Sequence, residues 1–148
     1  ATDAIAHWQA AHQDPTWATR RSRLHVLLAE ADRLQGIADL VGLSALPAEE
    51  RLTLLTSRLI REALLQQSAL SDNDASCAAD KQVALADAVL LVHDTAMRLS
   101  RSGVPASVIE EFDFGPLVRA KDTTGPDDAA GVSRIASELA STMKTLSS

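Results

Sequence analysis

The side chains in this chain that could act as nucleophiles or proton carriers are a single cysteine, Cys77, and four histidines. A catalytic cysteine or serine needs a histidine to accept its proton and a third group to orient that histidine. The nucleophile-elbow pattern G-x-S-x-G surrounds none of the serines. We therefore interpret Cys77 as a half-buried thiol or one near a helix cap, and we predict no catalytic residue in this chain.

The histidines do not have the spacing of a metal site. His7 and His12 are five residues apart and do not share a helix face well. The chain has neither the H-E-x-x-H pattern nor paired cysteines. His93 stands beside Asp94 in a long apolar segment, where a hydrogen-bonded histidine inside a helical bundle is the simpler interpretation. We assign no metal ligand.

Two clusters of charged residues could contact a partner. The arginines within Arg20–Arg23 could bind an anion or an acidic partner, although such a cluster more often forms a solvated helix face. The carboxylates within Glu110–Asp113 are interpreted as an exposed or docking surface. Neither G-x-x-x-x-G-K-[ST] nor G-x-G-x-x-G occurs, so the sequence predicts no phosphate-binding loop and no cofactor in this chain.

Charge and composition exclude several classes of partner. The net charge of −6 argues against a nucleic-acid-binding surface, which is usually strongly basic. One cysteine cannot form an internal disulfide, and no apolar run approaches the roughly 20 residues that cross a bilayer. We expect a cytoplasmic setting without membrane insertion. The chain begins at Ala1 rather than at a methionine, which is compatible with processing and with a fragment of a longer protein, and we favour the fragment.

The elements that would position these residues are helices. Apolar residues make up 46% of the chain, most of them Leu and Ala, and aromatic residues only 3%, which favours helices over strands. Spacings of three and four, together with proline and glycine punctuation, predict the helical segments 3–12, 15–41 (with a bend or split at Gly36 left open), 48–67, 80–102, 105–111 and a last helix after Gly125-Pro126.

These segments predict an all-α fold, a bundle of about five to seven helices without a sheet. Residues 1–148 are taken as one helical domain. The broad apolar stripe of residues 80–102 predicts that this segment is the central helix. Residues 68–77 have turn chemistry and are expected to form an ordered loop. The segment from Phe112 to Pro116 is not expected to stay helical past its proline.

One stretch of sequence is more specific. It runs from Val41–Leu54 through Arg58–Gln67 (RLIREALLQQ) and Asp74–Cys77 to Lys81-Gln82. It closely resembles the C-terminal helical domain of the catalytic A-subunit of V-type and archaeal A-type rotary ATPases, in which the run reads much like R-L-I-R-E-x-F-L-Q-Q-N-A-F. The strong similarity covers about residues 41 to 82, and weaker agreement extends to Asp14–Trp17 and Gly103–Pro105.

The resemblance implies a function that the chain would perform only as part of a larger machine. The phosphate loop, with ATP or ADP and Mg²⁺, would lie in an upstream nucleotide-binding domain of the full A-subunit. Copies of that protein would alternate with the B-subunit in a ring, and this domain would couple ATP turnover to rotation of the central rotor stalk. A separate membrane sector would move protons or sodium ions, so the expected location is cytoplasmic and peripheral to the membrane.

The resemblance also implies a nucleotide-side role for the end of the third helix. The family's Q-Q-N-A-F segment approaches the adenine side of the nucleotide pocket, and the matching positions here are Gln67, Ala69 and Leu70. Leu70 stands where the family usually has an aromatic residue, and Leu64 likewise replaces a phenylalanine. A stacking surface worth about 1 kcal/mol is therefore missing. A helix end that packs on a neighbouring domain remains the alternative.

Two other classes of function stay open. A free-standing helical protein–protein interaction module, without nucleotide chemistry, would bind a partner helix between the third and fourth helices. A small helical enzyme would require a polar cavity around His93 and Cys77, and we rank it last.

Overall fold

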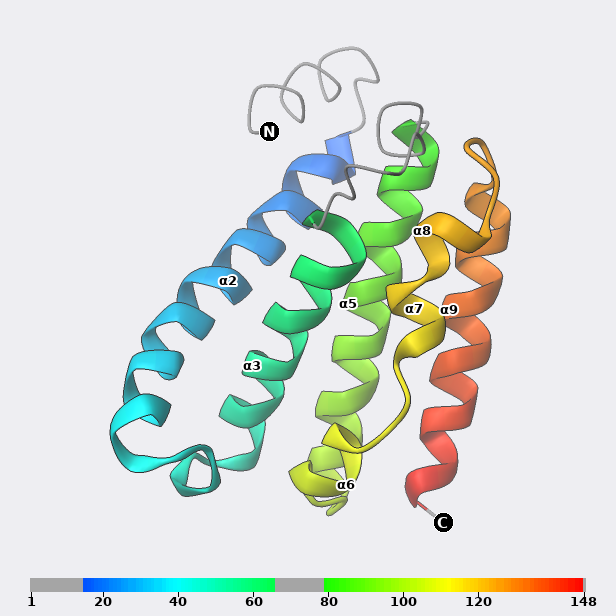
Figure 1. Ribbon diagram of the computed structural model, residues 1–148. Coiled ribbons are helices and arrows are strands. Elements are labelled where there is room, and N and C mark those ends of the chain that lie inside the picture. The colour runs from blue at the N-terminus through cyan, green and yellow to red at the C-terminus, as the bar shows by residue number, and fades with distance from the viewer. Residues whose placement is uncertain (1–14, 66–78, 148) are drawn as a thin grey trace.

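The computed structural model describes residues 15–65 and 79–147. Four long helices run side by side along the molecule (Figure 1): α2 (Pro15–Val41), α3 (Ala48–Ile60), α5 (Ala79–Arg101) and α9 (Ala129–Lys144). The connection from α5 to α9 contains three short helices, α6 (Ala106–Glu110), α7 (Gly115–Val118) and α8 (Ala120–Thr123). No residue in the two described ranges belongs to a strand. The predicted all-α bundle of five to seven helices is confirmed.

The turn between α2 and α3 forms one end of the molecule (Figure 1). α2 continues through Gly36 without a break and stops before Gly42, whose φ of 90° suits glycine and strains other residues. A 3₁₀ turn, η1 (Leu43–Ala45), then leads into α3. Glu49 and Glu50 lie in the first turn of α3, where the helix dipole favours carboxylates. α2 and α3 therefore form an antiparallel pair joined by a short, defined corner.

α3 changes into a wider helix at its C-terminal end. Its last turn continues as a π-helical segment, η2 (Arg61–Leu65). Such turns are uncommon and often occur near functional positions. The predicted end of this helix at Gln66 or Gln67, and the loop predicted for 68–77, lie outside the described residues.

α5 ends in a glycine cap, as the sequence predicts. Gly103 has a φ of 106°, and its N–H donates to Ser100 O at 3.0 Å while Val104 N–H donates to Leu99 O at 3.0 Å. This pair of bonds is the Schellman arrangement, which satisfies the last carbonyls of a helix. The chain reverses here and continues into α6.

The connection between α6 and α9 differs from the prediction. Helical structure resumes at Gly115 because Pro116 sits in the first turn of α7, where its missing N–H costs nothing. The proline therefore starts a helix rather than ending one. The last helix begins at Ala129, a few residues later than predicted, because the Asp128 carboxylate caps it by accepting from Gly131 N–H at 2.9 Å.

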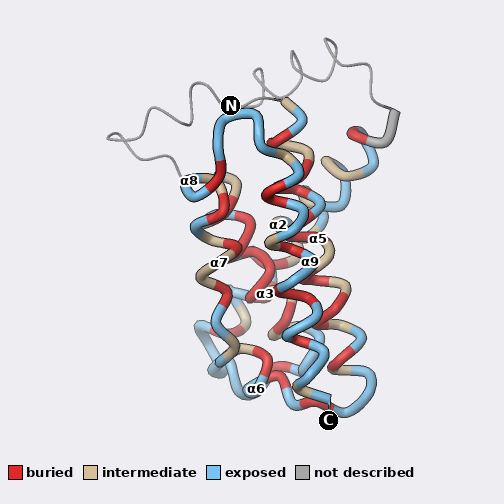
Figure 2. The backbone as a smooth tube through the Cα atoms, turned by 90° about the vertical axis from the view of Figure 1, so that its right-hand side faces the viewer, coloured by how far each residue is buried: buried red, intermediate tan, exposed pale blue. Residues whose placement is uncertain are grey.

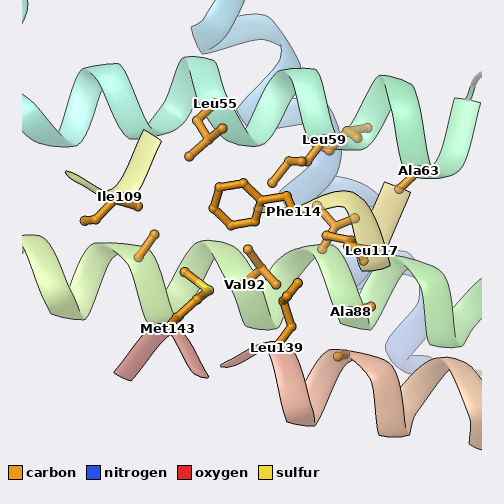
Figure 3. Close-up of a cluster of buried hydrophobic side chains, with 14 of the residues drawn as sticks. Leu55, Leu59, Ala63, Ala88, Val92, Ile109, Phe114, Leu117, Leu139 and Met143 are labelled. Atoms are coloured by element: carbon orange, nitrogen blue, oxygen red, sulfur yellow. The ribbon is translucent and has the colours of Figure 1, made fainter. Parts of the chain in front are cut away.

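The core surrounds α5, as predicted for the broadest apolar stripe. α5 packs on α9 and on α3, and Figure 2 shows buried positions along the facing sides of the helices. Phe114 enters the space between α3 and α5 from the α6–α7 connection (Figure 3). Side chains with 0% or 1% exposure that form this core are Leu52, Leu59, Ile60, Ala63, Leu85, Val89, Val92, Ile109, Leu117, Ala120, Val132 and Met143.

A smaller apolar cluster lies near the α2–α3 corner. Leu34, Ala38 and Leu46 are buried together there. The apolar spacing of α2 predicts that Val41 lies on the same buried stripe, but its side chain is 60% exposed. That expectation is wrong because the buried cluster at this end of α2 stops at Ala38, which packs with Leu46 from beyond the corner.

Candidate functional site

The residues predicted to lie near adenine, Gln67, Ala69 and Leu70, are outside the described residues, and so is Cys77. Leu65, the last described residue before them, ends η2 with a half-exposed side chain. The adenine-side role therefore stays a prediction.

Two of the arginines in the predicted basic cluster bind across the bundle to α5. Arg20 Nε donates to Asp87 Oδ1 at 2.6 Å, and Arg23 donates through two guanidinium nitrogens to Asp94, to Oδ1 at 2.8 Å and to Oδ2 at 3.4 Å. Their partners are carboxylates of the same chain, so these two side chains hold α2 against α5. The structure gives no support to an anion site formed by them.

His93 forms a buried polar contact, as the sequence interpretation predicted. Its Nδ1 lies 2.6 Å from Thr56 Oγ1, so α3 and α5 share a hydrogen bond inside the bundle. Burial lowers the pKa of His93; Asp94 partly offsets this effect, and Arg23 and Arg101 add to it. The neutral imidazole is therefore favoured, and its place in the fold is structural.

Lys81 is completely buried, which nothing in the sequence indicates. Its Nζ donates to two backbone carbonyls, Lys121 O within α8 at 2.7 Å and Thr124 O just after α8 at 3.1 Å. Thr124 Oγ1 in turn donates to Ala120 O at 2.7 Å. A buried ammonium needs such partners, and here it ties the start of α5 to α8.

Exposed apolar side chains gather at the α2–α3 corner. Leu40 is 86% exposed, Val41 60% and Leu43 44%. We call these three residues the tip patch. Single exposed apolar residues are ordinary, but a group at one projecting corner is typical of a contact with another molecule.

The three carboxylates of the acidic cluster near α6, Glu110, Glu111 and Asp113, have different surroundings. Glu110 binds the guanidinium of Arg51 through both carboxylate oxygens, and each of these side chains is only about one-fifth exposed, at 21% and 19%. Asp113 Oδ1 accepts from Gly115 N–H at 2.9 Å at the start of α7. Glu111 is exposed. α6 and the tip patch lie at the same end of the molecule (Figure 1).

A cleft of about 370 Å³ opens beside the tip patch. Leu54 and the buried Ala38 and Leu55 give it apolar walls. Arg58 and the Arg51–Glu110 pair contribute charged groups. The remaining lining residues are Gln35 and Leu43, so the cleft shares Leu43 with the tip patch.

The described residues supply two candidate contact surfaces, the tip patch and the cleft. Within them no group of three or more His, Cys, Asp or Glu side chains could hold a metal ion. Among the described helices, none combines the length and the apolar character that crossing a membrane requires. Because they join exposed apolar side chains to a cleft, the tip patch and the cleft are the candidate functional site.

Sequence reasoning missed the tip patch for an identifiable reason. Leu40 and Val41 continue the apolar pattern of α2, and such a pattern normally indicates burial. The available signal was their position immediately before Gly42, where the helix ends. Apolar side chains in the last turn before a sharp corner have fewer neighbours than those in the middle of a helix.

Comparison with known proteins identifies the family. Residues 6–109 match the family model described as the C-terminal domain of V and A type ATP synthase. The A-type ATP synthase A-subunit of Halobacterium salinarum is 34% identical over 146 residues, covering 97% of this chain and 25% of that protein. The V-type ATP synthase alpha chain of Nitrosococcus oceani is 41% identical over 116 residues, covering 78% and 19% respectively.

A third relative, the A-type ATP synthase A-subunit of Pyrococcus horikoshii, is 37% identical over 110 residues, covering 74% of this chain and 11% of that protein. The chain thus spans a quarter or less of the length of these curated relatives. The relatives are A-subunits or alpha chains, and the match lies in the region that the family model describes as C-terminal. The chain therefore belongs to the family of C-terminal domains of the V-type and A-type ATP synthase A-subunit.

Proposed function

We propose that this chain is the C-terminal helical domain of a catalytic A-subunit, in which it couples ATP turnover to rotation of a central stalk. The full protein would carry a nucleotide-binding domain upstream of this one and alternate with the B-subunit in a ring. Family membership supports this role, and so does the length of the relatives, of which the chain covers a quarter or less. The parent protein, rather than this domain, would be the ATPase.

The shape of the α2–α3 pair suits a lever. At 1.5 Å per residue, the 27 residues of α2 span about 40 Å. Asp32 on α2 pairs with Arg61, the first residue of η2, at 3.4 Å, and Arg33 on α2 lies 4.0 Å from the Glu50 carboxylate on α3. α2 also packs on α3, and in this proposal the two helices move as one unit. A displacement at the start of α2 would therefore reach the tip.

The exposed tip patch is the observation that carries the proposal. It lies at the end of the molecule opposite the N-terminal end of α2 (Figure 1). If the upstream domain binds nucleotide at the other end, the tip would be free to contact another subunit. Apolar contact there, with the stalk as partner, would bury Leu40, Val41 and Leu43, which otherwise face water.

The other end of the domain would face the nucleotide. We propose that Gln67, Ala69 and Leu70 contribute to the adenine side of a pocket whose phosphate loop and Mg²⁺ ion belong to the upstream domain. If so, Leu70→Phe in the full-length protein should tighten binding of a fluorescent ATP analogue, because it adds a stacking surface. Equal affinities for the variant and the wild type would count against an adenine-side role.

The assembled machine would be peripheral to a membrane on its cytoplasmic side. Its separate membrane sector would carry protons or sodium ions, and this domain would not enter the bilayer. Both statements follow from the proposed role in a rotary ATP synthase.

The coupling role can be tested with serine at the tip. In the full complex, Leu40→Ser, Val41→Ser and Leu43→Ser combined should leave ATP hydrolysis largely intact but reduce ion transport per ATP hydrolysed. The reason is that nucleotide chemistry happens elsewhere, while force transmission needs the tip contact. Transport and hydrolysis are measured on the same reconstituted vesicles.

The matched control is Val26→Ser, which alters an apolar residue of α2 that is 66% exposed but lies away from the tip. It should change neither hydrolysis nor transport. Unchanged coupling in the triple tip variant would contradict the proposed role of this end of the bundle.

A further inference from the structure

The cleft beside the tip has a defined chemical character. Its depth is apolar, since Ala38 and Leu55 are buried and Leu54 is half-buried. Its volume, about 370 Å³, is at the small end of the range for binding pockets. It therefore suits one or two inserted apolar side chains better than a large ligand.

The charged groups at the cleft are not equivalent. Arg51 and Glu110 neutralise one another in a bidentate salt bridge. Arg58 is different, because its side chain is 56% exposed and its ion pair with Glu62 is longer, at 3.6 Å, so N–H donors of its guanidinium can still meet a second carboxylate. The charges among the cleft-lining residues sum to one positive charge, and this charge is carried by an arginine that can still bind a carboxylate.

The cleft is continuous with the tip patch. Leu43 belongs to both, so a molecule that covers the tip can reach into the cleft without leaving the surface. A helix fits this geometry, because residues three or four apart lie on one face and can enter the cleft and meet Arg58 together. Helix-in-groove binding uses anchors at such spacings.

From these observations we infer that the cleft between α2, α3 and α6 receives an apolar side chain of a partner helix, while Arg58 binds a carboxylate one turn away on that helix. The inference rests on the proposed function, in which the partner helix belongs to the central stalk. The contact would then have two parts. The tip patch would make apolar contact with the stalk, and the cleft would hold a side chain of the stalk helix. The second part would fix the register between this domain and the stalk.

The test measures binding of the purified central-stalk protein to the full-length protein that carries this chain. Gln35→Trp places a bulky ring at the mouth of the cleft, and Arg58→Glu reverses the charge of the arginine that would bind the partner's carboxylate. Each should weaken binding about tenfold or more, as expected when a packed anchor of an interface is lost. Thermal unfolding of each variant, followed by circular dichroism, establishes that the domain is still folded.

Arg61→Glu is the matched control for Arg58→Glu. Arg61 lies one turn further along, is 57% exposed and pairs with Asp32, and it does not line the cleft. Its reversal should change stalk binding by less than about twofold, the usual effect of an exposed charge outside the contact. Replacing the stalk carboxylates one at a time with lysine should then yield one variant that restores binding to Arg58→Glu.

The outcomes separate the two proposals. If Leu40→Ser weakens stalk binding while Gln35→Trp and Arg58→Glu bind like the wild type, the cleft contact is wrong and the tip contact stands. If the wild-type protein does not bind the stalk at all, both are wrong. Weakening by the two cleft variants, with no effect of Arg61→Glu and rescue by a stalk lysine, is the result that supports the inference.

Discussion

Thr56 on α3 and His93 on α5 lie 2.6 Å apart, Oγ1 to Nδ1, where their residues are only 2% and 8% exposed. This hydrogen bond joins the lever helix α3 to the central helix of the bundle. It also makes the α3–α5 contact sensitive to protonation, because the histidine has been taken out of water and has a lowered pKa.

The stability of the domain should therefore fall as the pH is lowered through the range in which His93 titrates. The unfolded chain takes up a proton near the usual histidine pKa of about 6.5, whereas the folded chain resists protonation to a lower pH. The contribution is fully present above about pH 6.5 and is lost as the pH falls toward the folded-state pKa.

Urea unfolding at about pH 7.5 and about pH 5 checks this sign. The wild type should lose more free energy of unfolding between the two pH values than His93→Gln does. His25→Gln, at an exposed position of α2, should behave like the wild type. An equal pH dependence in His93→Gln and wild type would contradict the assigned role of His93.

Lys81 should be a structural residue despite its charge. Lys81→Met leaves the carbonyls of Lys121 and Thr124 without this donor, at a cost of about 1–3 kcal/mol in the free energy of unfolding. Amide hydrogen exchange in α8 should also become faster. Lys144→Met, at the exposed end of α9, is the control and should leave both measurements unchanged.

The Arg51–Glu110 pair should be worth more than an ordinary surface ion pair. Both side chains are about four-fifths covered, and both carboxylate oxygens are engaged. A double-mutant cycle with Arg51→Ala and Glu110→Ala should give a coupling free energy of about 1 kcal/mol, at the upper end of values for exposed pairs. The more exposed Arg101–Glu49 pair should give less, and the opposite order would contradict this ranking.

Alanine should have opposite effects on stability at two glycines, Gly36 and Gly103. A Cβ atom would meet nothing within 4 Å at either Gly36 or Gly103, so backbone conformation alone decides the outcome. Gly36→Ala, inside α2, should stabilise the domain by about 0.5–1 kcal/mol. Gly103→Ala should destabilise it by about 1–2 kcal/mol, because its φ is 106°. Chemical unfolding of both variants distinguishes these opposite signs.

Much of the fold could be predicted from the sequence because the signals are local. The spacing of apolar residues in 80–102 predicted the central helix, and Gly42 and Gly103 marked the corners that the structure shows. α7 and α8 were missed because each is a single turn whose stability comes from packing. Pro116 starts α7 rather than ending a helix, and local sequence does not separate those two uses of proline.

The candidate site was harder to predict because it depends on which helices are neighbours. Nothing in the sequence places Arg51 beside Glu110, or Arg20 beside Asp87, since these pairs join distant segments. Lysine is rarely fully buried, so its type alone gave no reason to expect Lys81 in the interior. The family resemblance, by contrast, needed no such knowledge, and the comparisons confirm it.

Disulfide cross-linking at the tip tests the central claim most directly. In the full complex, Leu40→Cys should form a cross-link with cysteines introduced along the central stalk, and the link should stop ATP-driven ion transport until it is reduced. Val26→Cys, exposed on α2 but away from the tip, should not cross-link to the same stalk positions. Cross-linking from Val26 and none from Leu40 would contradict the account, because the tip would then not be the surface that meets the stalk.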